Sequence, residues 1–166
     1  MNITIEKASA KDAEALLELL KAIGSETENL SFGSEGLPFS ITDEEQYLDA
    51  LYNSSDGIML LAKENEKIIA SASLNRLPRR MSHRGELSIS VLKDYWNQGI
   101  GKRLMSAIIE FAKENYFSII ELQVRSDNTA AIHLYEKFGF IKTGTHPYFF
   151  AIDGKAIPFD YMCLQI

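Results

Sequence analysis

The chain has 166 residues, 46% hydrophobic and 24% charged, with a formal net charge of −6. This is the size and composition of one ordinary globular domain, so we expect a single domain over residues 1–166 and exclude a disordered, collagenous or coiled-coil chain. The longest apolar run, residues 58–62, is far shorter than the roughly 20 residues that cross a bilayer, so neither a membrane span nor a secretory signal is expected. The single cysteine, Cys163, cannot form an internal disulfide, which favours the reducing cytoplasm.

The charges are unevenly distributed along the chain. The acidic balance argues against a general nucleic-acid binder, because neutralising phosphates needs a basic surface. Between Lys21 and Lys63 there is no Lys or Arg, whereas residues 76–103 carry most of the arginines. Two interpretations stay open: two solvated surfaces of opposite sign, or a site for a cationic partner beside one for a polyanion. The acidic group is Glu26, Glu28, Glu35, Asp43, Glu44, Glu45, Asp49 and Asp56, and the basic group is Arg76, Arg79, Arg80, Arg84, Lys93, Lys102 and Arg103.

The chain begins with a predicted strand and a predicted helix. Alternation at Ile3 and Ile5 indicates the strand. The helix is expected to begin at Ser9 or Asp12, because apolar residues recur from there at helical spacing. Gly24 is expected to end it.

A loop, a short helix and a hairpin are expected next. Residues 25–40 are rich in glycine and serine, which predicts a long loop, and loops of that length are often functional. Thr42, with Glu45 three residues later, predicts a capped helix. The apolar runs 57–62 and 67–74 flank a short polar segment and predict two hairpin strands.

The middle of the chain predicts a strand, a glycine loop and a helix in direct succession. Residues 86–92 alternate with period two, which puts their apolar and polar side chains on opposite faces of a strand. Residues 100–111 carry an apolar stripe at helical spacing. Gly99 and Gly101 lie between these two elements.

The last part of the chain repeats this order and ends in a hairpin. Residues 120–125 predict another strand, and a helix is expected from Asp127 or Asn128 to Gly139. Residues 153–154, Asp-Gly, predict a tight turn between two terminal strands. The complete predicted order, β-α-α-β-β-β-α-β-α-β-β, indicates an α/β or α+β domain around one mixed sheet.

The glycine loop is suited to binding an anion. The first turn of a helix has unpaired N–H donors at the positive end of the helix dipole. Glycines at 99 and 101 let an anion approach the backbone, and Lys102 and Arg103 add positive charge. The alternative is a strand-to-helix turn that needs glycine for its conformation alone.

Two familiar phosphate loops do not fit this spacing. A dinucleotide-binding fingerprint needs a third glycine where Leu104 stands. A P-loop needs glycine where Trp96 stands and Ser or Thr where Arg103 stands. Nucleotide binding is therefore a weaker interpretation of the loop.

The segments 86–105 and 128–140 closely resemble the two central motifs of the GNAT superfamily of acetyl-CoA-dependent N-acetyltransferases. The family loop has Gln or Arg where this chain has Trp96, so a side-chain contact from that position is not carried over. The resemblance implies a central mixed, twisted sheet of about seven strands flanked by about four helices. It also implies that two central parallel strands splay apart.

The resemblance implies acetyl-CoA as cosubstrate and assigns the residues that bind it. The pantetheine arm would pair with the strand backbone at Ile89, Ser90 and Val91, because free strand N–H and C=O groups need partners. Asn128 would contact the coenzyme, or serve only as a helix cap. The pyrophosphate would be held by the loop, which comprises Gln98, Gly99, Ile100, Gly101, Lys102 and Arg103.

Two residues are candidates for catalysis. Tyr135 matches a tyrosine that many family members use as general acid, and a phenol is protonated at neutral pH, but it also lies on an apolar stripe and could be core. Glu86 is the candidate base, or else a surface residue at the start of its strand. No nucleophile with an adjacent base is seen, and Cys163 is expected in the core, which favours direct transfer in a ternary complex. The histidines have no metal-binding spacing, so no metal is expected.

The predicted function is acetyl transfer from acetyl-CoA to a primary amine, either a small cationic molecule or a protein N-terminus. The alternative is a non-catalytic acyl-CoA-binding sensor or interaction module. In the family, the acceptor is selected by segments corresponding to residues 25–50 and 143–160, where Phe32, Phe39, Tyr148 and Phe149 could line the pocket or belong to the core. Family members are often homodimers, so the resemblance implies that this chain can also form a homodimer.

Overall fold

The computed structural model describes residues 2–166. The elements follow one another in the predicted order, with three additional short 3-10 turns. No helix in the described range is long and apolar enough to span a membrane. The elements are β1 (Ile3–Lys7), α1 (Ala13–Glu26), α2 (Ile41–Tyr52), β2 (Gly57–Glu64), β3 (Lys67–Arg76), β4 (Arg84–Val91), α3 (Ile100–Glu114), β5 (Ile119–Arg125), α4 (Thr129–Lys137), β6 (Ile141–Ile152) and β7 (Lys155–Gln165).

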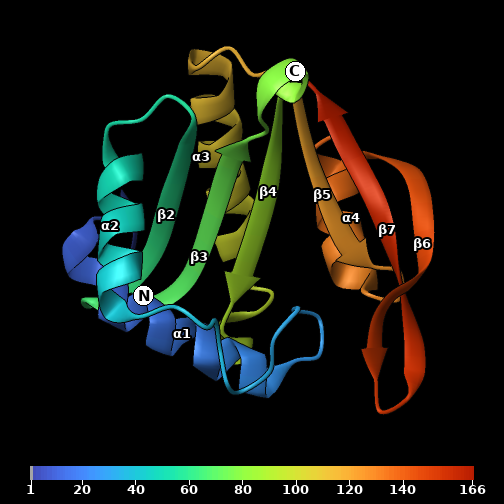
Figure 1. Ribbon diagram of the computed structural model, residues 1–166, viewed down its shortest axis with the longest axis horizontal. Coiled ribbons are helices and arrows are strands. Elements are labelled where there is room, and N and C mark those ends of the chain that lie inside the picture. Colours follow the sequence, from blue (N-terminus) through green and yellow to red (C-terminus); the bar gives the residue numbers. More distant parts are fainter. Residues whose placement is uncertain (1) are drawn as a thin grey trace.

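The strands form one seven-stranded mixed sheet in the order β1-β2-β3-β4-β5-β7-β6. Among the described strands, β4 and β5 are the parallel pair, and all other neighbours are antiparallel. Helices α1 and α2 cover one face of the sheet, and α3 and α4 cover the other (Figure 1). The predicted architecture is thereby confirmed.

The pairing of β4 with β5 is short. It joins Arg84 to Ile119, Gly85 to Ile120 and Glu86 to Glu121, and it ends there. Beyond these pairs the two strands diverge, as Figure 1 shows. The predicted splay is confirmed, and it leaves a wedge in the middle of the sheet whose two sides belong to different halves of the molecule.

The core beneath β4 fixes one side of the wedge. Leu87 of β4 is buried, as the predicted alternation requires. Helix α3 packs below it with a fully buried stripe, Leu104, Met105 and Ile108. Buried apolar side chains at native packing density hold a strand firmly in place, so β4 is a rigid wall.

The predictions for α1 and α2 need two corrections. Helix α1 does not end at Gly24 but continues to Glu26. A Cβ at Gly24 would lie 2.1 Å from the carbonyl oxygen of Gly33, so this glycine allows the loop that follows α1 to approach the helix. Helix α2 is capped by Ser40, not Thr42, because the Ser40 hydroxyl accepts a hydrogen bond from the Asp43 N–H at 3.0 Å.

A buried ion cluster connects β1, β2 and the start of α1. The Nζ atom of Lys63 lies 2.9 Å from Oδ1 of Asp12, with side-chain exposures of 8% and 9%, and it also contacts the Glu6 carboxylate. Burial alone would raise the pKa of Asp12. Hydrogen bonds from the Ser9 N–H and from Lys63 outweigh it, so the pKa of Asp12 lies below its ordinary value.

The Asp12→Asn substitution should lower the free energy of unfolding by about 2–3 kcal/mol, because it removes one of the two carboxylates that neutralise the buried Lys63. The lowered pKa of Asp12 makes this contribution fully present above the ordinary carboxyl pKa of about 4 and progressively lost as pH falls through the lowered value. Denaturant titrations at several pH values should therefore show that the difference between the two proteins shrinks in acid. Glu18→Gln, in an exposed pair with Lys21, is the matched control and should cost less than about 1 kcal/mol. Equal effects would contradict a stabilising role for the buried cluster.

Candidate acetyl-CoA and amine site

A cleft of about 1160 Å³ opens where β4 and β5 diverge. Its walls come from β4, the segment after α1, the start of α3, the end of β5, α4 and the β6–β7 hairpin. The predicted site residues that line it are Glu86, Ile89, Ser90, Val91, Gly99, Ile100, Gly101, Lys102, Asn128 and Tyr135. Segments far apart in the sequence are thus brought together at one place.

The backbone of β4 offers free groups to the cleft at alternate residues. The Leu92 N–H donates to the Ile69 carbonyl at 3.0 Å, so the even-numbered residues of β4 direct their backbone groups towards β3. Ile89 and Val91 consequently direct theirs towards the wedge. Ser90 was expected to pair with a ligand, but its backbone groups face Ser71 of β3 and are not available.

Trp96 occupies one of these free groups. Its indole Nε1–H donates to the Val91 carbonyl at 2.8 Å, and the residue lines the cleft. This contact gives Trp96 a place in the loop that does not depend on a ligand. The groups that this edge of β4 offers to the cleft include the N–H and C=O of Ile89 and the N–H of Val91.

The start of α3 presents free donors to the same cleft. Gly99 is the N-cap, with φ +78° and no side-chain cap. The first helical hydrogen bond joins the Arg103 N–H to the Gly99 carbonyl at 3.1 Å. The N–H groups of Ile100, Gly101 and Lys102 therefore precede the helical ladder and lack intrahelical partners. Together with the helix dipole they form a site suited to a phosphate.

The side chains of Gln98 and Arg103, both predicted for the loop site, donate to backbone carbonyls of the protein itself. The Gln98 amide donates to the Asp94 carbonyl at 2.8 Å, and the Arg103 guanidinium donates to the Ile3 carbonyl at 2.8 Å. Both residues border a shallow hollow on the β1 side rather than the cleft. The backbone N–H of Arg103 is used within the helix, so Arg103 offers no backbone donor to the phosphate cradle, whereas a backbone contact from Gln98 stays a prediction.

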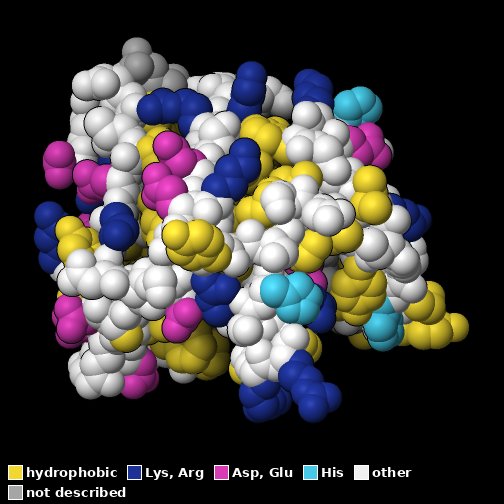
Figure 2. All heavy atoms as spheres, turned by 90° about the horizontal axis from the view of Figure 1, so that it is seen from above, with side chains coloured by type: hydrophobic (Ala, Val, Ile, Leu, Met, Phe, Trp, Pro, Cys, Tyr) yellow, Lys and Arg dark blue, Asp and Glu magenta, His cyan; other side chains and the backbone are white. Residues whose placement is uncertain are grey.

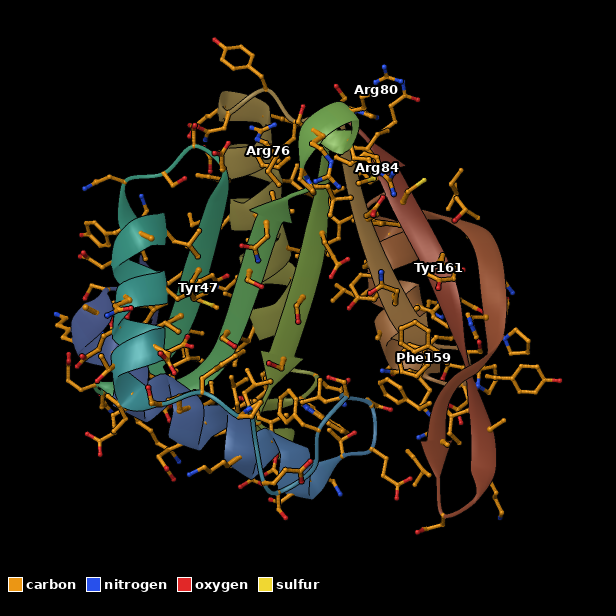
Figure 3. All side chains as sticks on the ribbon, in the orientation of Figure 1. Tyr47, Arg76, Arg80, Arg84, Phe159 and Tyr161 are labelled. Carbon is orange, nitrogen blue, oxygen red and sulfur yellow. The ribbon has the colours of Figure 1, made fainter. Side chains whose placement is uncertain are left out.

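The basic stretch 76–103 does not gather around the glycine loop either. Arg84 forms two hydrogen bonds with Glu121, at 2.7 and 2.9 Å, and Arg76 is paired with Asp56 at 3.0 Å. Figure 3 places Arg76, Arg80 and Arg84 near the β3–β4 turn, at the opposite end of β4 from the loop. From above, basic and acidic side chains are interspersed (Figure 2). Of the basic residues in this stretch, Lys102 lines the cleft.

Gly99→Ala should destabilise the protein by about 1–2 kcal/mol, because an alanine at φ +78° adopts a left-handed conformation. A Cβ there meets no atom within 4 Å, so no steric clash contributes. Gly144→Ala is the matched control, since its Cβ also meets nothing within 4 Å and its φ is not positive. Chemical denaturation measures the free energy of unfolding of both variants. Equal values would show that the left-handed backbone conformation at residue 99 does not require glycine.

Glu86 is an exposed residue that lines the cleft, and its carboxylate has no countercharge beside it. In the sheet it lies beside Glu121, which Arg84 neutralises. Glu86 itself forms no ion pair among residues 2–166. Its carboxylate accepts a long hydrogen bond, 3.4 Å, from the Gln123 amide. Such a group can accept a proton or bind an ammonium ion.

Tyr135 approaches the cleft from the α4 side. The residue is 9% exposed, and its ring packs against Phe140 with centroids 5.8 Å apart. Burial raises the pKa of Tyr135 to about 12, so the hydroxyl keeps its proton at neutral pH. The residue both packs against the core and lines the cleft, where its hydroxyl can serve as a hydrogen-bond donor.

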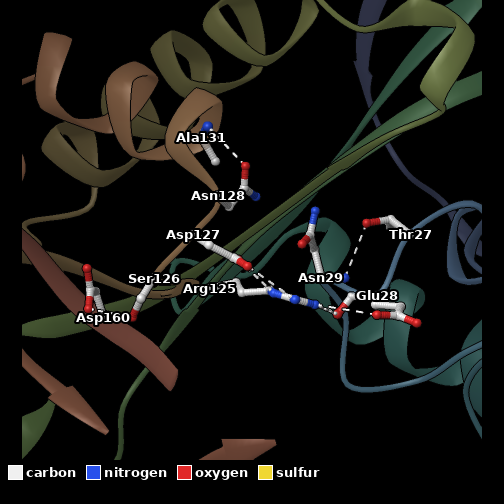
Figure 4. Close-up of polar contacts among 9 residues, drawn as sticks. All are labelled: Thr27, Glu28, Asn29, Arg125, Ser126, Asp127, Asn128, Ala131 and Asp160. Atoms are coloured by element: carbon white, nitrogen blue, oxygen red, sulfur yellow. Dashed lines mark hydrogen bonds and ion pairs between the residues drawn. The ribbon is translucent and has the colours of Figure 1, made fainter. Parts of the chain in front are cut away.

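Asn128 caps α4, one of the two roles expected for it. Its Oδ1 accepts a hydrogen bond from the Ala131 N–H at 3.3 Å (Figure 4). Because Asn128 also lines the cleft, its amide nitrogen can still donate to a ligand.

Comparison with known proteins places the chain in a family. The model of the acetyltransferase (GNAT) family matches residues 25–140. The chain belongs to the GNAT family. Over 94 residues it is 31% identical to the N-alpha-acetyltransferase RimI of Mycobacterium tuberculosis, a match that covers 56% of this chain and 58% of RimI. The chain therefore spans little more than half the length of that relative.

Solved structures confirm the fold over 99% of the chain. A GNAT acetyltransferase from Streptococcus pneumoniae is 32% identical and superimposes with a TM-score of 0.96, covering 99% of this chain and 100% of the other. The structure of yncA from Salmonella typhimurium with its cofactor acetyl-CoA has a TM-score of 0.86 at 22% identity and covers 99% and 94% of the two chains. At that identity the second likeness concerns the fold alone.

A polar bridge across the open end of the wedge was not predicted. Arg125, at the end of β5, forms a bidentate pair with the Asp127 carboxylate, to which Nε donates at 2.7 Å and Nη2 at 3.2 Å. Its Nη1 reaches the Glu28 carbonyl at 3.4 Å and the Glu28 carboxylate at 3.7 Å (Figure 4). The bridge joins the β5 half of this GNAT domain to the segment after α1, and no local pattern could have indicated a contact between residues 97 positions apart.

The aromatic lining of the cleft was predicted in part. Phe32 and Phe149 line it, which is one of the two roles that the sequence left open for them. Phe39 and Tyr148 do not belong to the lining, and both are exposed, at 51% and 74%. The lining also includes Phe150 and Phe159, which sequence reasoning missed.

Proposed function

We propose that this GNAT protein is an acyltransferase that moves the acetyl group of acetyl-CoA to a primary amine by direct attack in a ternary complex. The observation that carries the proposal is the continuity of the cleft. One space contains the donors at the start of α3, the free edge of β4, the uncompensated carboxylate of Glu86 and the protonated hydroxyl of Tyr135. The match of residues 25–140 to the model of the acetyltransferase (GNAT) family supports the choice of cosubstrate.

The free backbone groups fit the chemistry of coenzyme A. Ile89 and Val91 offer one carbonyl and two N–H groups, which can pair with the amides of a pantetheine arm in the manner of an added strand. Ile100, Gly101 and Lys102 offer N–H groups to a pyrophosphate, and the Asn128 amide adds a side-chain donor. Acetyl-CoA supplies an acetyl group activated as a thioester.

Glu86 and Tyr135 have complementary tasks in this proposal. A primary amine with an ordinary pKa of about 10 is mostly protonated at neutral pH and must lose a proton before it can attack a carbonyl. Glu86 binds the ammonium form and accepts that proton, directly or through water. Tyr135 holds its own proton and donates a hydrogen bond to the departing sulfur.

An assay of thiol release from acetyl-CoA with a panel of primary amines tests the proposed function. We expect release that depends on the amine, together with an acetylated product identified by mass spectrometry. Trp96, the single tryptophan, lines the cleft and should report acetyl-CoA binding by its fluorescence. Binding without transfer to any amine would instead support the acyl-CoA sensor.

We further propose a cytoplasmic homodimer that does not bind nucleic acid. The single cysteine, Cys163, is unpaired, which suits a reducing compartment. The net charge of −6 disfavours binding to the phosphate backbones of nucleic acids.

The proposed homodimer rests on edge strand β6. This strand exposes Ile141 and Tyr148, at 63% and 74%, and exposed edges of this kind favour association. Light scattering after size exclusion measures the oligomeric state.

A further inference from the structure

Three phenylalanines form a compact group on the β6–β7 side of the cleft, called the aromatic wall below: Phe149, Phe150 and Phe159. The rings of Phe149 and Phe159 are stacked with centroids 4.4 Å apart, and Phe150 is tilted against Phe159 at 4.4 Å. Phe159 is 4% exposed and anchors the group, whereas Phe149 and Phe150 are half-buried. Figure 3 shows Phe159 on β7, on the side of the cleft opposite α2.

A β-bulge places two consecutive side chains in this wall. The register of β6 with β7 shifts between His146 and Phe150, so three residues of β6 lie opposite Pro158 alone. In a regular strand, neighbours such as Phe149 and Phe150 would point to opposite faces of the sheet. Here both line the cleft. Bulges re-aim side chains in this way beside binding sites.

The other residues of the cleft indicate which class of amine acceptor fits beside the aromatic wall. Phe32, from the segment after α1, adds an apolar side chain to the lining, while Glu86 on β4 provides an uncompensated negative charge. Arg125 is occupied by Asp127 and Glu28. The acceptor region thus combines one site for a single cationic amine with a larger apolar surface. Among the described residues that line the cleft, Glu86 is the only carboxylate, so a second ammonium group of a polyamine would find no acidic partner there.

We propose that the acceptor is a small monoamine whose primary amine is carried on an aromatic skeleton. Its amine lies at Glu86, and its ring packs against Phe149 and Phe150. This inference rests on the proposed acetyl transfer and narrows the amine to one chemical class.

The test compares kcat/KM for phenethylamine, propylamine and spermidine. We expect phenethylamine to exceed the other two by at least about 10-fold, because a buried ring contributes far more than a short alkyl chain. Phe149→Ala should remove this preference, because it lowers kcat/KM for phenethylamine by at least about 10-fold and affects propylamine less. Phe150→Leu, which keeps most of the apolar volume, should reduce the preference only partly. Tyr148→Ala, on the same strand but outside the cleft, is the matched control and should change neither rate.

A binding measurement separates this inference from the proposed function. The ¹⁹F signal of 4-fluorophenethylamine should broaden in the presence of the protein and coenzyme A, and Phe149→Ala should abolish the broadening. If broadening is seen but no amine is acetylated, the proposed transfer fails while the aromatic site stands. Equal rates for phenethylamine and propylamine, a preference for spermidine, or broadening that persists in folded Phe149→Ala would overturn the inference.

Discussion

Replacing Tyr135 with phenylalanine is expected to lower kcat by about 100- to 1000-fold, the range that one positioned proton donor contributes. The ring would remain packed against Phe140. Because only the hydroxyl is lost, the Kd for acetyl-CoA should stay within about twofold and the fold should be unchanged. Steady-state kinetics and a Trp96 fluorescence titration on the same samples measure the two quantities.

Tyr116→Phe is the matched control for this experiment. Tyr116 is 89% exposed on the turn after α3, so removing its hydroxyl should change neither kcat nor Kd. If Tyr135→Phe instead weakens acetyl-CoA binding and lowers the melting temperature with little change in kcat, Tyr135 is a packing residue and another group assists the leaving thiolate.

The second large effect is expected at Glu86. Glu86→Gln keeps the size of the side chain but removes the negative charge and the ability to accept a proton, so kcat/KM at neutral pH should fall by about 100-fold. The defect should shrink as pH rises towards the amine pKa of about 10, because the amine then loses its proton to solvent. A pH–rate profile of both proteins, with one amine, measures this.

Glu114→Gln is the control for Glu86→Gln. Glu114 is exposed at the end of α3 and away from the cleft, and its substitution should leave the profile unchanged. A Glu86→Gln defect of the same size at every pH would contradict a role in deprotonating the amine and would leave Glu86 an anchor for the ammonium group.

The features that follow from local sequence periodicity were predictable. The alternation in 86–92 and the helical stripe in 100–111 each report burial on one face, and both elements formed as expected. The order of the predicted strands and helices along the chain then predicted one mixed sheet. Glu86 and Tyr135 were assigned from the resemblance to the GNAT superfamily, and both line the cleft. The apolar stripe that carries Tyr135 indicates burial alone.

The features that depend on long-range contacts were not predictable. The Arg125–Glu28 bridge joins residues far apart in the sequence, and Phe150 reaches the cleft through a bulge that breaks the expected alternation of its strand. The basic stretch misled for a related reason. Arg76 and Arg84 pair with distant carboxylates, and Arg103 donates to a backbone carbonyl, so a count of local charge does not predict where the cations lie.

Amide hydrogen exchange with and without acetyl-CoA tests the central claim most directly, namely that the coenzyme fills the wedge between β4 and β5. The Val91 N–H faces the wedge, whereas the neighbouring Ser90 N–H is already paired with β3 and serves as an internal control. Acetyl-CoA should slow exchange at Val91 and at Gly101, at the start of α3, by at least about 10-fold and leave Ser90 unchanged. Saturating acetyl-CoA that leaves exchange at Val91 and Gly101 unaltered would contradict the account.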